Sequence, residues 1–401
     1  MGGYLIFNYQ FSIFNQYPMN KFSNTKILSI DTSCDETSAA VTLLRQGYGR
    51  AGPVEVLSNV IWSQASQHAQ FGGVMPSLAQ RMHKERIDWV VERALRQAQC
   101  DWTAMGAIAV TIGPGLAMAL EVGIAKAKEL SKQLNIPLIP INHLEGHLLS
   151  PLATLSTSPL SPLHNYGEGE LRGVRWPALG LVVSGGHTEL VLIKKIGEYE
   201  ILARTQDDAL GEALDKAARM LGLGYPGGAV LEKMARLAHS TGSGQAYPLP
   251  LPMSRSADKS SFSYSGLKTA FYRLISTKYS VLSTQQIYDL AAAFQNRAFQ
   301  HLERVVNNVL TSPLLFPSPK LRRGVGERLD LLVGGGVAAN MELRKRLRKI
   351  GKEMNLKVRF PYSLKLCGDN AAMIGVAAGF KNYKYIEVDQ RPRWRVSEVL
   401  G

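Results

Sequence analysis

The sequence has 401 residues, of which 45% are hydrophobic, and its 46 Lys and Arg against 32 Asp and Glu give a net charge of +14. No apolar run reaches the ~18 residues that a membrane-spanning helix needs, so we expect a soluble globular protein of two or three domains. Three cysteines without a CxxC spacing argue against a disulfide framework and a cysteine-based zinc site, and they fit a reducing cytoplasm.

The positive charge leaves two kinds of protein open. A field of this size attracts polyanions such as RNA, but a basic enzyme without any nucleic-acid role carries the same charge. Charge alone does not separate the two.

Residues 1–25 are rich in aromatic residues and in Asn and Gln. They lack the basic start and the continuous apolar stretch of a signal peptide. We expect this segment to be a disordered N-terminal extension, with ordered sequence from about Ile27.

The rest of the chain repeats one plan. A strand, a polar turn and a second strand are predicted from Ile27 and again from Leu179. A strand that leads through glycines into a helix is predicted at residues 107–134 and again at residues 330–354. This repetition predicts a duplicated α/β domain.

We therefore expect a first lobe over residues 26–150 and a second over residues 151–401, with a cleft between them. Two stretches of the second lobe, about 155–175 and 312–328, are interpreted as inserted loops, because their Pro and Gly residues forbid a regular element. The basic residues of the later loop could contact RNA, but a solvated loop is the simpler interpretation.

Two amphipathic helices are predicted between the strands. One runs from about Pro76 to Arg96. The other follows a capping box at Ser283 and Gln286, after which apolar residues recur every three or four positions up to Val309. We interpret both as helices that pack on the core.

Two histidines, His143 and His147, lie four residues apart in Ile-Asn-His-Leu-Glu-Gly-His. On a helix their side chains share one face and can reach one metal ion. Glu145 would lie about 200° from His143 around that helix, so the His-Glu-x-x-His pattern of zinc proteases is not met. A pair of histidines alone is a weak signal, because core packing also explains it.

Asp369 is a candidate third ligand. Two histidines and one carboxylate leave coordination positions open, which a metal that holds a substrate needs. Asp369 also precedes an Ala- and Gly-rich helical run, where a helix N-cap is the plain alternative. The sequence does not place it beside His143.

Glycine-rich turns follow strands or helices at four places, and such turns present backbone N–H groups that can hold phosphates. They lie at residues 113–115, 184–188, 224–228 and 334–336. A Gly-x-x-x-x-Gly-Lys-Ser/Thr motif is absent, which excludes a P-loop. The layout suits the other kind of nucleotide cleft, in which hairpin turns of two lobes face the phosphates.

Three acids are candidates for chemistry: Asp31 and Glu36 after the first strand, and Asp215 in the helix predicted from Ala209 to Leu221. The plain alternative for such acids is a solvated face or a helix start that the helix dipole favours.

Taken together, these motifs resemble those of a known family, the universal tRNA threonylcarbamoyladenosine transferase subunit in its bacterial form. This family was once described as an O-sialoglycoprotein endopeptidase. The motifs occur in the family's order from Ile27 to the end, and their number makes the resemblance specific. They are Ile-Asp-Thr-Ser-Cys-Asp-Glu-Thr (30–37), Phe-Gly-Gly-Val-Met-Pro-Ser-Leu-Ala (71–79), Gly-Pro-Gly-Leu (113–116), His-Leu-Glu-Gly-His (143–147), Val-Val-Ser-Gly-Gly-His-Thr (182–188), Asp-Asp-Ala-Leu-Gly-Glu-Ala-Leu-Asp-Lys (207–216), Gly-Tyr-Pro-Gly-Gly (224–228), Ser-Phe-Ser-Tyr-Ser-Gly-Leu-Lys-Thr (261–269), Gly-Gly-Val-Ala-Ala-Asn (335–340), Cys-Gly-Asp-Asn (367–370) and Arg-Pro-Arg-Trp (391–394). Many members have Thr-Asp-Asn where this chain has Gly-Asp-Asn.

The resemblance implies a two-lobed actin/Hsp70-like fold and an acyltransferase. The reaction would transfer a threonylcarbamoyl group from threonylcarbamoyl-AMP to N6 of the adenosine just 3′ of the anticodon, in tRNAs that read codons beginning with A. AMP would leave. The resemblance also implies a smaller paralogous subunit and a P-loop ATPase as partners in the cytoplasm.

The resemblance further implies roles for individual residues. The ligands of one divalent metal ion, Fe²⁺ or Zn²⁺, would be His143, His147 and Asp369. The substrate contacts would be Val182, Val183, Ser184, Gly185, Gly186, Asp215, Gly228 and Asn340. Glu36 or Asp35 would orient or deprotonate the adenine amine, because an exocyclic amine is a poor nucleophile.

Three other functions compete with this one. The old family description suggests a glycoprotein metallopeptidase, which the position of Glu145 disfavours. A small-molecule kinase of the same fold class would leave the two histidines without a task. A non-catalytic subunit could lose the candidate ligands freely, and this chain keeps them.

Overall fold

The computed structural model describes residues 24–44, 54–155, 174, 176–241, 247–254, 258, 260–278, 281–312, 329–381 and 388–399. The expected N-terminal extension, up to residue 23, and nearly all of the two expected inserted loops lie outside these residues. In this described part, no helix combines the length and the apolar character that a membrane span requires.

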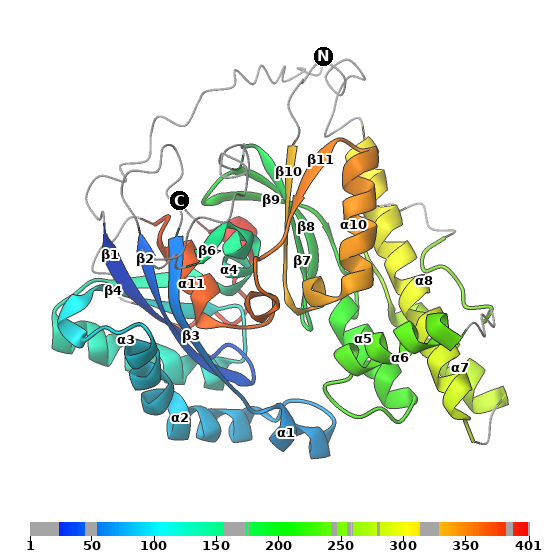
Figure 1. The fold of residues 1–401 in the computed structure, drawn as a ribbon, viewed down its shortest axis with the longest axis horizontal. Coiled ribbons are helices and arrows are strands. Elements are labelled where there is room, and N and C mark those ends of the chain that lie inside the picture. The colour runs from blue at the N-terminus through cyan, green and yellow to red at the C-terminus, as the bar shows by residue number, and fades with distance from the viewer. Residues whose placement is uncertain are drawn as a thin grey trace, which may run out of the picture.

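The first sheet has six strands in the order β5-β4-β1-β2-β3-β6 (Figure 1). They are β1 (Thr25–Asp31), β2 (Glu36–Leu44), β3 (Val54–Ser63), β4 (Met105–Gly113), β5 (Leu138–Asn142) and β6 (Ala153–Leu155). Strands β1, β2 and β3 form an antiparallel meander, and β4 and β5 add to β1 in parallel. Most residues of β1 and β4 are buried, as expected for inner strands covered on both faces.

The second sheet has five strands in the order β11-β10-β7-β8-β9. They are β7 (Ala178–Val183), β8 (Thr188–Lys195), β9 (Glu198–Arg204), β10 (Leu329–Gly334) and β11 (Leu356–Arg359). Here too the first three strands form an antiparallel meander, and β10 and β11 add to β7 in parallel.

The two sheets therefore share one topology, with β7 to β11 in the places of β1 to β5. This agreement confirms the duplicated plan and the expected fold class, a two-lobed α/β fold of the actin/Hsp70-like type. In a parallel sheet the carboxyl ends of the strands lie at one edge, which is where ligands of such folds bind.

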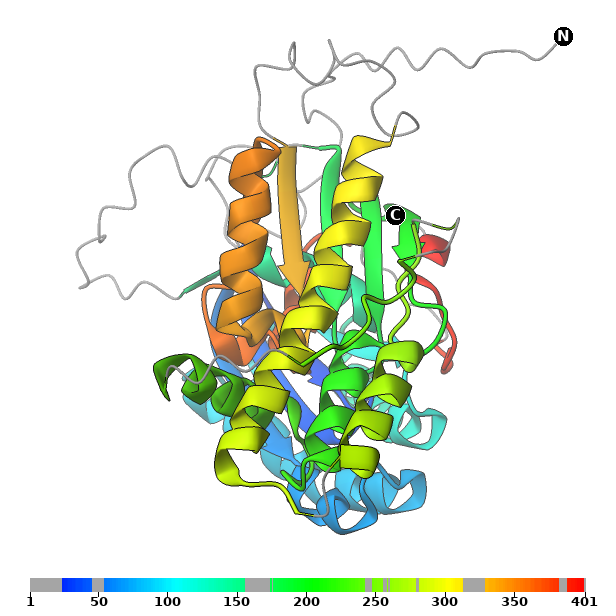
Figure 2. The ribbon, with the colours of Figure 1, turned by 90° about the vertical axis from the view of Figure 1, so that its right-hand side faces the viewer.

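Helices cover the outer face of each sheet. In the first lobe α1 (Ala65–His68) precedes α2 (Pro76–Gln97), which packs against β2, β3 and α3 (Ala117–Leu134). The second lobe contains α5 (Leu210–Met220), α6 (Gly228–Thr241), α7 (Ser265–Lys278), α8 (Thr284–Thr311) and α10 (Met341–Glu353). Figure 2 shows α8 and α10 side by side in front of β10. Short 3₁₀ segments are η2 (Ala69–Phe71), η3 (Trp102–Ala104), η4 (Ser150–Leu152), η5 (Gly336–Ala339), η6 (Leu364–Leu366) and η7 (Val396–Glu398).

Both helices expected from the sequence are confirmed. Helix α2 begins at Pro76, the position that Pro favours because it has no N–H to leave unpaired. Helix α8 begins after Ser283, whose hydroxyl accepts from the Gln286 N–H while the Gln286 side chain accepts from the Ser283 N–H.

Two short helices lie between the sheets, α4 (His143–Leu149) after β5 and α11 (Ala371–Ala378) after η6 (Figure 1). Each packs on the sheet of the other lobe: α4 contacts β7 and β10, and α11 contacts β1, β2 and β3. They touch each other at Gly146, where a side chain would press on Ile374 and Met373. We keep a division near residue 150 as a proposal for the lobes, with α11 as a segment that returns to the first sheet.

Candidate metal centre and cleft

The first two candidate ligands lie at the start of α4. Asn142 ends β5 and caps α4, because its side-chain oxygen accepts from the N–H groups of Leu144 and Glu145. The helix therefore begins at His143, and His147 follows one turn later on the same face. Their rings meet edge to face with centroids 4.7 Å apart.

The third candidate ligand comes from the far end of the chain. Asp369 Oδ1 lies 3.1 Å from Nε2 of His147 and 3.4 Å from Nε2 of His143. The plain alternative, that Asp369 caps the helix, is wrong: Asn370 caps α11 by accepting from the Met373 N–H, so the Asp369 carboxylate is free to face the histidines.

The three side chains fit a metal ion. One atom from each of His143, His147 and Asp369 lies within 4.8 Å of the other two. Two neutral imidazoles and one carboxylate are a common donor set for divalent transition metals. Nδ1 of His143 faces Asp31 Oδ2 at 3.6 Å, so a second carboxylate lies on the side of this ring away from Asp369, the place of the outer carboxylate in many metalloenzymes, and Nε2 would be left for the ion.

Burial and charge act against each other in this centre. Burial alone lowers the pKa of His143, but the carboxylates of Asp369 and Asp31 raise it to about 10. Burial lowers the pKa of His147, with a partial offset from its bond to Asp369. The pKa of Asp369 is held well below its usual range, because the two histidines outweigh its burial. Without a metal, the carboxylate therefore keeps one proton on His143, and a divalent cation would displace that proton.

Glu145 faces away from the centre. Its carboxylate is fully buried, and its Oε1 accepts from the Tyr199 hydroxyl at 2.7 Å and pairs with Lys381 at 2.9 Å. Tyr199 lies on β9 and Lys381 follows α11, so this contact fixes α4 to both. These contacts agree with the expectation that Glu145 does not face the same ion as both histidines.

The turn after β7 offers open backbone groups beside the centre. The Ser184 N–H donates to the His187 carbonyl, and the Ser184 hydroxyl accepts from the His187 N–H, so the turn is closed on itself. Gly185 and Gly186 are exposed, and a side chain at either would meet no other atom within 4 Å. Burial beside His143 and His147 lowers the pKa of His187 to about 4, which keeps this ring neutral.

Comparison with known proteins identifies the family. A family model described as tRNA N6-adenosine threonylcarbamoyltransferase matches residues 55–376. A protein of that name from Chelativorans sp. (strain BNC1) is 41% identical over 382 residues, which cover 93% of this chain and 96% of that protein. Another of that name from Nostoc punctiforme is 41% identical over 364 residues, 88% of this chain and 90% of that protein.

The chain belongs to this threonylcarbamoyltransferase family. Among solved structures, full-length HypF in its phosphate- and nucleotide-bound form aligns at 14% identity with a TM-score of 0.46, over 90% of this chain and 55% of that one. Component A of the (R)-2-hydroxyglutaryl-CoA dehydratase of Acidaminococcus fermentans aligns at 13% identity with a TM-score of 0.44, over 88% and 99%. These distant likenesses carry no argument about function.

The structure of this family member brings further candidate residues to the cleft from the second lobe. Asp215 Oδ1 accepts from the N–H groups of Gly227 at 2.8 Å and Gly228 at 2.7 Å, so it holds the turn after α5. Asn340 is less available: its oxygen caps α10 through the Leu343 N–H and its amide donates to Gln295. Val182 and Val183 are buried in β7, so only their backbone can reach a ligand.

The acidic turn, residues 34–36, faces this second-lobe turn. Burial, Asp35 and Asp369 together raise the pKa of Glu36 well above its usual range. Tyr225 of the other lobe is affected by the same charges. Burial and, after it, the charge of Asp35 raise the pKa of its hydroxyl. Carboxylates of the first lobe and a phenol of the second therefore lie close enough to affect each other's charge.

Two residues near the centre were not among the assigned site residues. His187 directly follows the 184–186 turn, and a histidine at a glycine turn is the signal that could have found it. Asp31 was a candidate acid, but only the structure shows that it faces His143 rather than a substrate.

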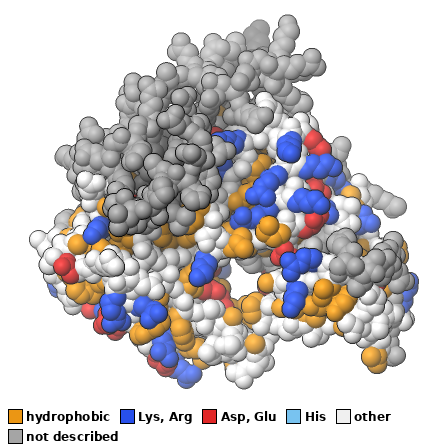
Figure 3. Space-filling view, viewed as in Figure 1, with side chains coloured by type: hydrophobic (Ala, Val, Ile, Leu, Met, Phe, Trp, Pro, Cys, Tyr) orange, Lys and Arg blue, Asp and Glu red, His pale blue; other side chains and the backbone are white. Residues whose placement is uncertain are grey.

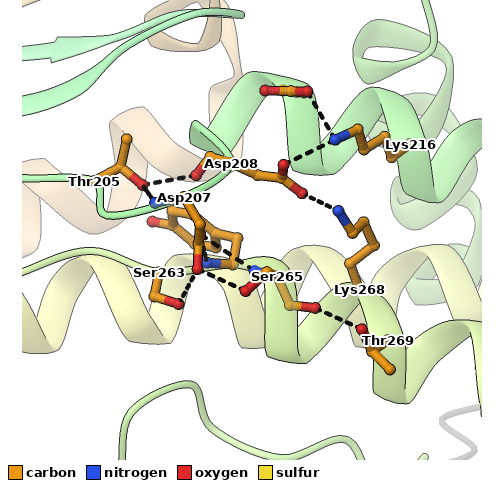
Figure 4. A network of polar contacts seen from close by, with 10 residues as sticks. Thr205, Asp207, Asp208, Lys216, Ser263, Ser265, Lys268 and Thr269 are labelled. Carbon is orange, nitrogen blue, oxygen red and sulfur yellow. Dashed lines mark hydrogen bonds and ion pairs between the residues drawn. The ribbon is translucent and has the colours of Figure 1, made fainter.

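A second polar cluster lies outside the centre and ties α5 to α7 (Figure 4). Asp207 accepts from the hydroxyls of Ser263 and Ser265 and from the Tyr264 N–H, so it fixes the start of α7. Asp208 pairs with Lys216 and Lys268. All polar groups of this cluster that Figure 4 labels face one another, which assigns it to the scaffold.

Proposed function

We propose that the protein is a tRNA N6-adenosine threonylcarbamoyltransferase, which transfers the threonylcarbamoyl group of threonylcarbamoyl-AMP to N6 of the adenosine just 3′ of the anticodon and releases AMP. Family membership supports the reaction. The observation that carries its location is the convergence of His143, His147 and Asp369 beside the open turn at residues 184–186.

The proposed metal ligands are His143, His147 and Asp369. When bound, the ion would act as a Lewis acid toward the carbamoyl carbonyl and would bind the threonyl part of the donor. Two histidines and one carboxylate are the ligand set of many non-haem Fe(II) sites, so we propose Fe²⁺, with Zn²⁺ as the alternative ion.

The proposed substrate groove runs from the metal centre to the turns of the second lobe. The N–H groups of Gly185 and Gly186 would stabilise the charge that builds on the departing phosphate. Asp215 accepts hydrogen bonds from the N–H groups of Gly227 and Gly228 and so fixes this turn. In the proposal, AMP would bind against the turn.

In the transfer step the N6 lone pair attacks the carbamoyl carbon. The N6–C bond forms, the C–O bond of the mixed anhydride breaks, and AMP leaves with that electron pair. The N6 proton must be accepted by a base, and we propose Glu36 for this role, with Asp35 as the alternative. A raised carboxyl pKa suits a base that works near neutral pH.

The proposed partners are tRNA, a smaller paralogous subunit and a P-loop ATPase, in the cytoplasm. The net charge of +14 supports contact with RNA phosphates. Figure 3 shows Lys and Arg side chains gathered over the second lobe, where α10 carries the exposed residues Lys345, Arg348 and Lys349.

The test is a transfer assay with the purified protein, its partners, threonylcarbamoyl-AMP and unmodified tRNA. Mass spectrometry of the digested tRNA should show threonylcarbamoyladenosine together with one AMP for each modified base. Metal-dependent cleavage of a glycoprotein, or phosphorylation of a small molecule by ATP, without modified tRNA would contradict the proposal.

A further inference from the structure

A continuous series of hydrogen bonds links an exposed segment of the first lobe to the acidic turn. We call residues 69–75, between α1 and α2, the mouth segment. The Met75 N–H donates to His68 Nδ1 at 3.3 Å, His68 Nε2 meets Gln64 Oε1 at 3.1 Å, Gln64 Nε2 meets His83 Nδ1 at 3.2 Å, and His83 Nε2 meets the Cys34 carbonyl at 3.0 Å.

When both rings are neutral, one arrangement of protons satisfies this relay. A backbone carbonyl can only accept, so His83 Nε2 carries the proton and donates to Cys34. Nδ1 of His83 then accepts from the Gln64 amide and from the Thr37 hydroxyl at 2.8 Å. His68 likewise carries its proton on Nε2, because its Nδ1 accepts from Met75. Burial lowers the pKa of His83, which favours this neutral form.

The relay ends on the backbone directly before Glu36. His83 holds the carbonyl of Cys34, and the Gln64 N–H donates to the carbonyl of Asp35 at 2.9 Å. The side chains of Gln64, His68 and His83 are fully buried. Unpaired polar groups are costly in such a place, so the relay fixes where the acidic turn lies.

The other end of the relay is an exposed segment of the first lobe that α5 of the second lobe contacts. In the mouth segment Phe71 and Met75 are 53% and 42% exposed, which is unusual for such side chains in a folded lobe. The Gly72 carbonyl accepts from Arg219 of α5 at 3.0 Å, so the second lobe reaches across to this segment. Figure 1 shows α1 below the first sheet and α5 below the second.

We propose that the mouth segment contacts the acceptor RNA through Phe71, and that the relay of His68, Gln64 and His83 positions Glu36 when this contact forms. The inference rests on the proposed function. An adenine that reacts at N6 must leave its stack, and an exposed aromatic ring is a surface on which a displaced base can stack. The relay residues touch no substrate; they are positioning residues.

The proton arrangement can be tested without any assay of activity. The nitrogen shifts of ¹⁵N-labelled histidine in the full chain should show His68 and His83 neutral, each with its proton on Nε2. Signals that are absent in His68→Gln and His83→Gln assign the two rings. A His83 ring protonated on both nitrogens, or on Nδ1 alone, would overturn the relay.

The coupling is tested by a double-mutant cycle of Phe71→Ala and Gln64→Glu in the complete modification complex. Gln64→Glu keeps the size but removes the donor to His83, and we expect kcat to fall by roughly 10- to 100-fold, with unchanged metal affinity and unchanged KM for threonylcarbamoyl-AMP. Phe71→Ala should lower kcat about tenfold in the normal chain but only slightly when Gln64→Glu is also present.

Tyr272→Ala is the matched control, because Tyr272 on α7 is 58% exposed and lies outside the cleft residues. It should leave kcat unchanged. Additive effects of Phe71→Ala and Gln64→Glu would overturn the coupling while leaving the proposed function intact. A normal chain that forms no threonylcarbamoyladenosine would instead overturn the proposed function, and the histidine spectra would still report on the relay.

Discussion

At the scale of single residues, the carboxylates around the two histidines have different tasks. Asp369 faces Nε2 of both rings, whereas Asp31 faces only Nδ1 of His143. The first position suits a ligand and the second an outer group that orients a ligand. Residue identity alone does not distinguish them, since each is an aspartate near the end of a regular element: Asp31 ends β1, and Asp369 lies two residues before α11.

This difference predicts graded metal affinities. Asp31→Asn should weaken metal binding by about 10- to 100-fold, the usual effect of losing an outer partner. Asp369→Asn should weaken it further, because a ligand is lost. Calorimetric titration of metal-free protein with Fe²⁺ under anaerobic conditions, and with Zn²⁺, measures both. Equal affinities for the two variants would contradict the assigned roles.

Glu36 predicts opposite effects on activity and stability. As a base it must be ionised, so kcat should rise with pH through its raised pKa and level off above it. Glu36→Gln should remove this rise and most of the activity. Activity of Glu36→Gln with an unchanged pH profile would exclude Glu36 and leave Asp35 as the candidate.

The sign for stability follows from linkage. Because the folded chain raises the pKa of Glu36, the unfolded chain loses the proton first, and stability falls as pH rises from the ordinary carboxyl range to the raised pKa. Metal-free Glu36→Gln should therefore melt at a higher temperature than the normal chain near neutral pH and at the same temperature in acid. A lower melting temperature at neutral pH would contradict this.

At the scale of elements, much of the site could be predicted from sequence because its parts are local. The helical spacing of His143 and His147, the capping box of α8 and the glycine turns depend on neighbours along the chain. The family resemblance implied Asp369 as a third ligand, but the residues alone could not place it beside His147, because that contact depends on how α11 crosses α4. The choice of Asn370 over Asp369 as the helix cap likewise needed the backbone geometry.

Gly334 allows a test of how closely α4 must pack on β10. A Cβ there would overlap the carbonyl of His147, and the following Gly335 has a φ of +96° that also disfavours a side chain. Gly334→Ala should push α4 away from β10, destabilise the fold by about 1–3 kcal/mol and weaken metal binding. Denaturant unfolding and metal titration measure the two effects.

Ser283→Ala is the matched control for this change. It removes the cap of α8 and should cost about 0.5–2 kcal/mol, but α8 packs mainly on α5, α6 and α10 rather than on the proposed metal ligands. Metal affinity should therefore stay normal in Ser283→Ala at a similar loss of stability. If Gly334→Ala also bound metal normally, the packing of α4 on β10 would not set the ligand geometry.

At the scale of the whole molecule, the duplication explains why the site lies where it does. Each lobe ends in a helix that packs on the other lobe's sheet, α4 from the first and α11 from the second. The candidate ligands lie on α4 and two residues before α11, so the proposed metal centre would join the two lobes rather than belong to one. The repeat was visible in the sequence, but the exchange of helices was not.

The positive charge of the molecule predicts that its affinity for tRNA falls as the salt concentration rises. Lys345 and Lys349 lie exposed on the basic helix α10, and Lys349 forms a long pair with Glu353 at 3.9 Å. If α10 contacts RNA phosphates, Lys345→Gln with Lys349→Gln should reduce the slope of log K against log salt by about one per lost contact. Filter binding at several salt concentrations measures this slope. An unchanged slope would place the RNA on another face.

The central claim is that the cleft performs a metal-dependent transfer to tRNA, and one measurement tests it most directly. Threonylcarbamoyladenosine is quantified by mass spectrometry for the normal protein and for His147→Ala, with the partners, threonylcarbamoyl-AMP and Fe²⁺ or Zn²⁺ present. We predict product with the normal protein, loss of product on chelation, recovery on adding metal, and no product with His147→Ala. Full activity of His147→Ala, or of the chelated normal protein, would contradict the account.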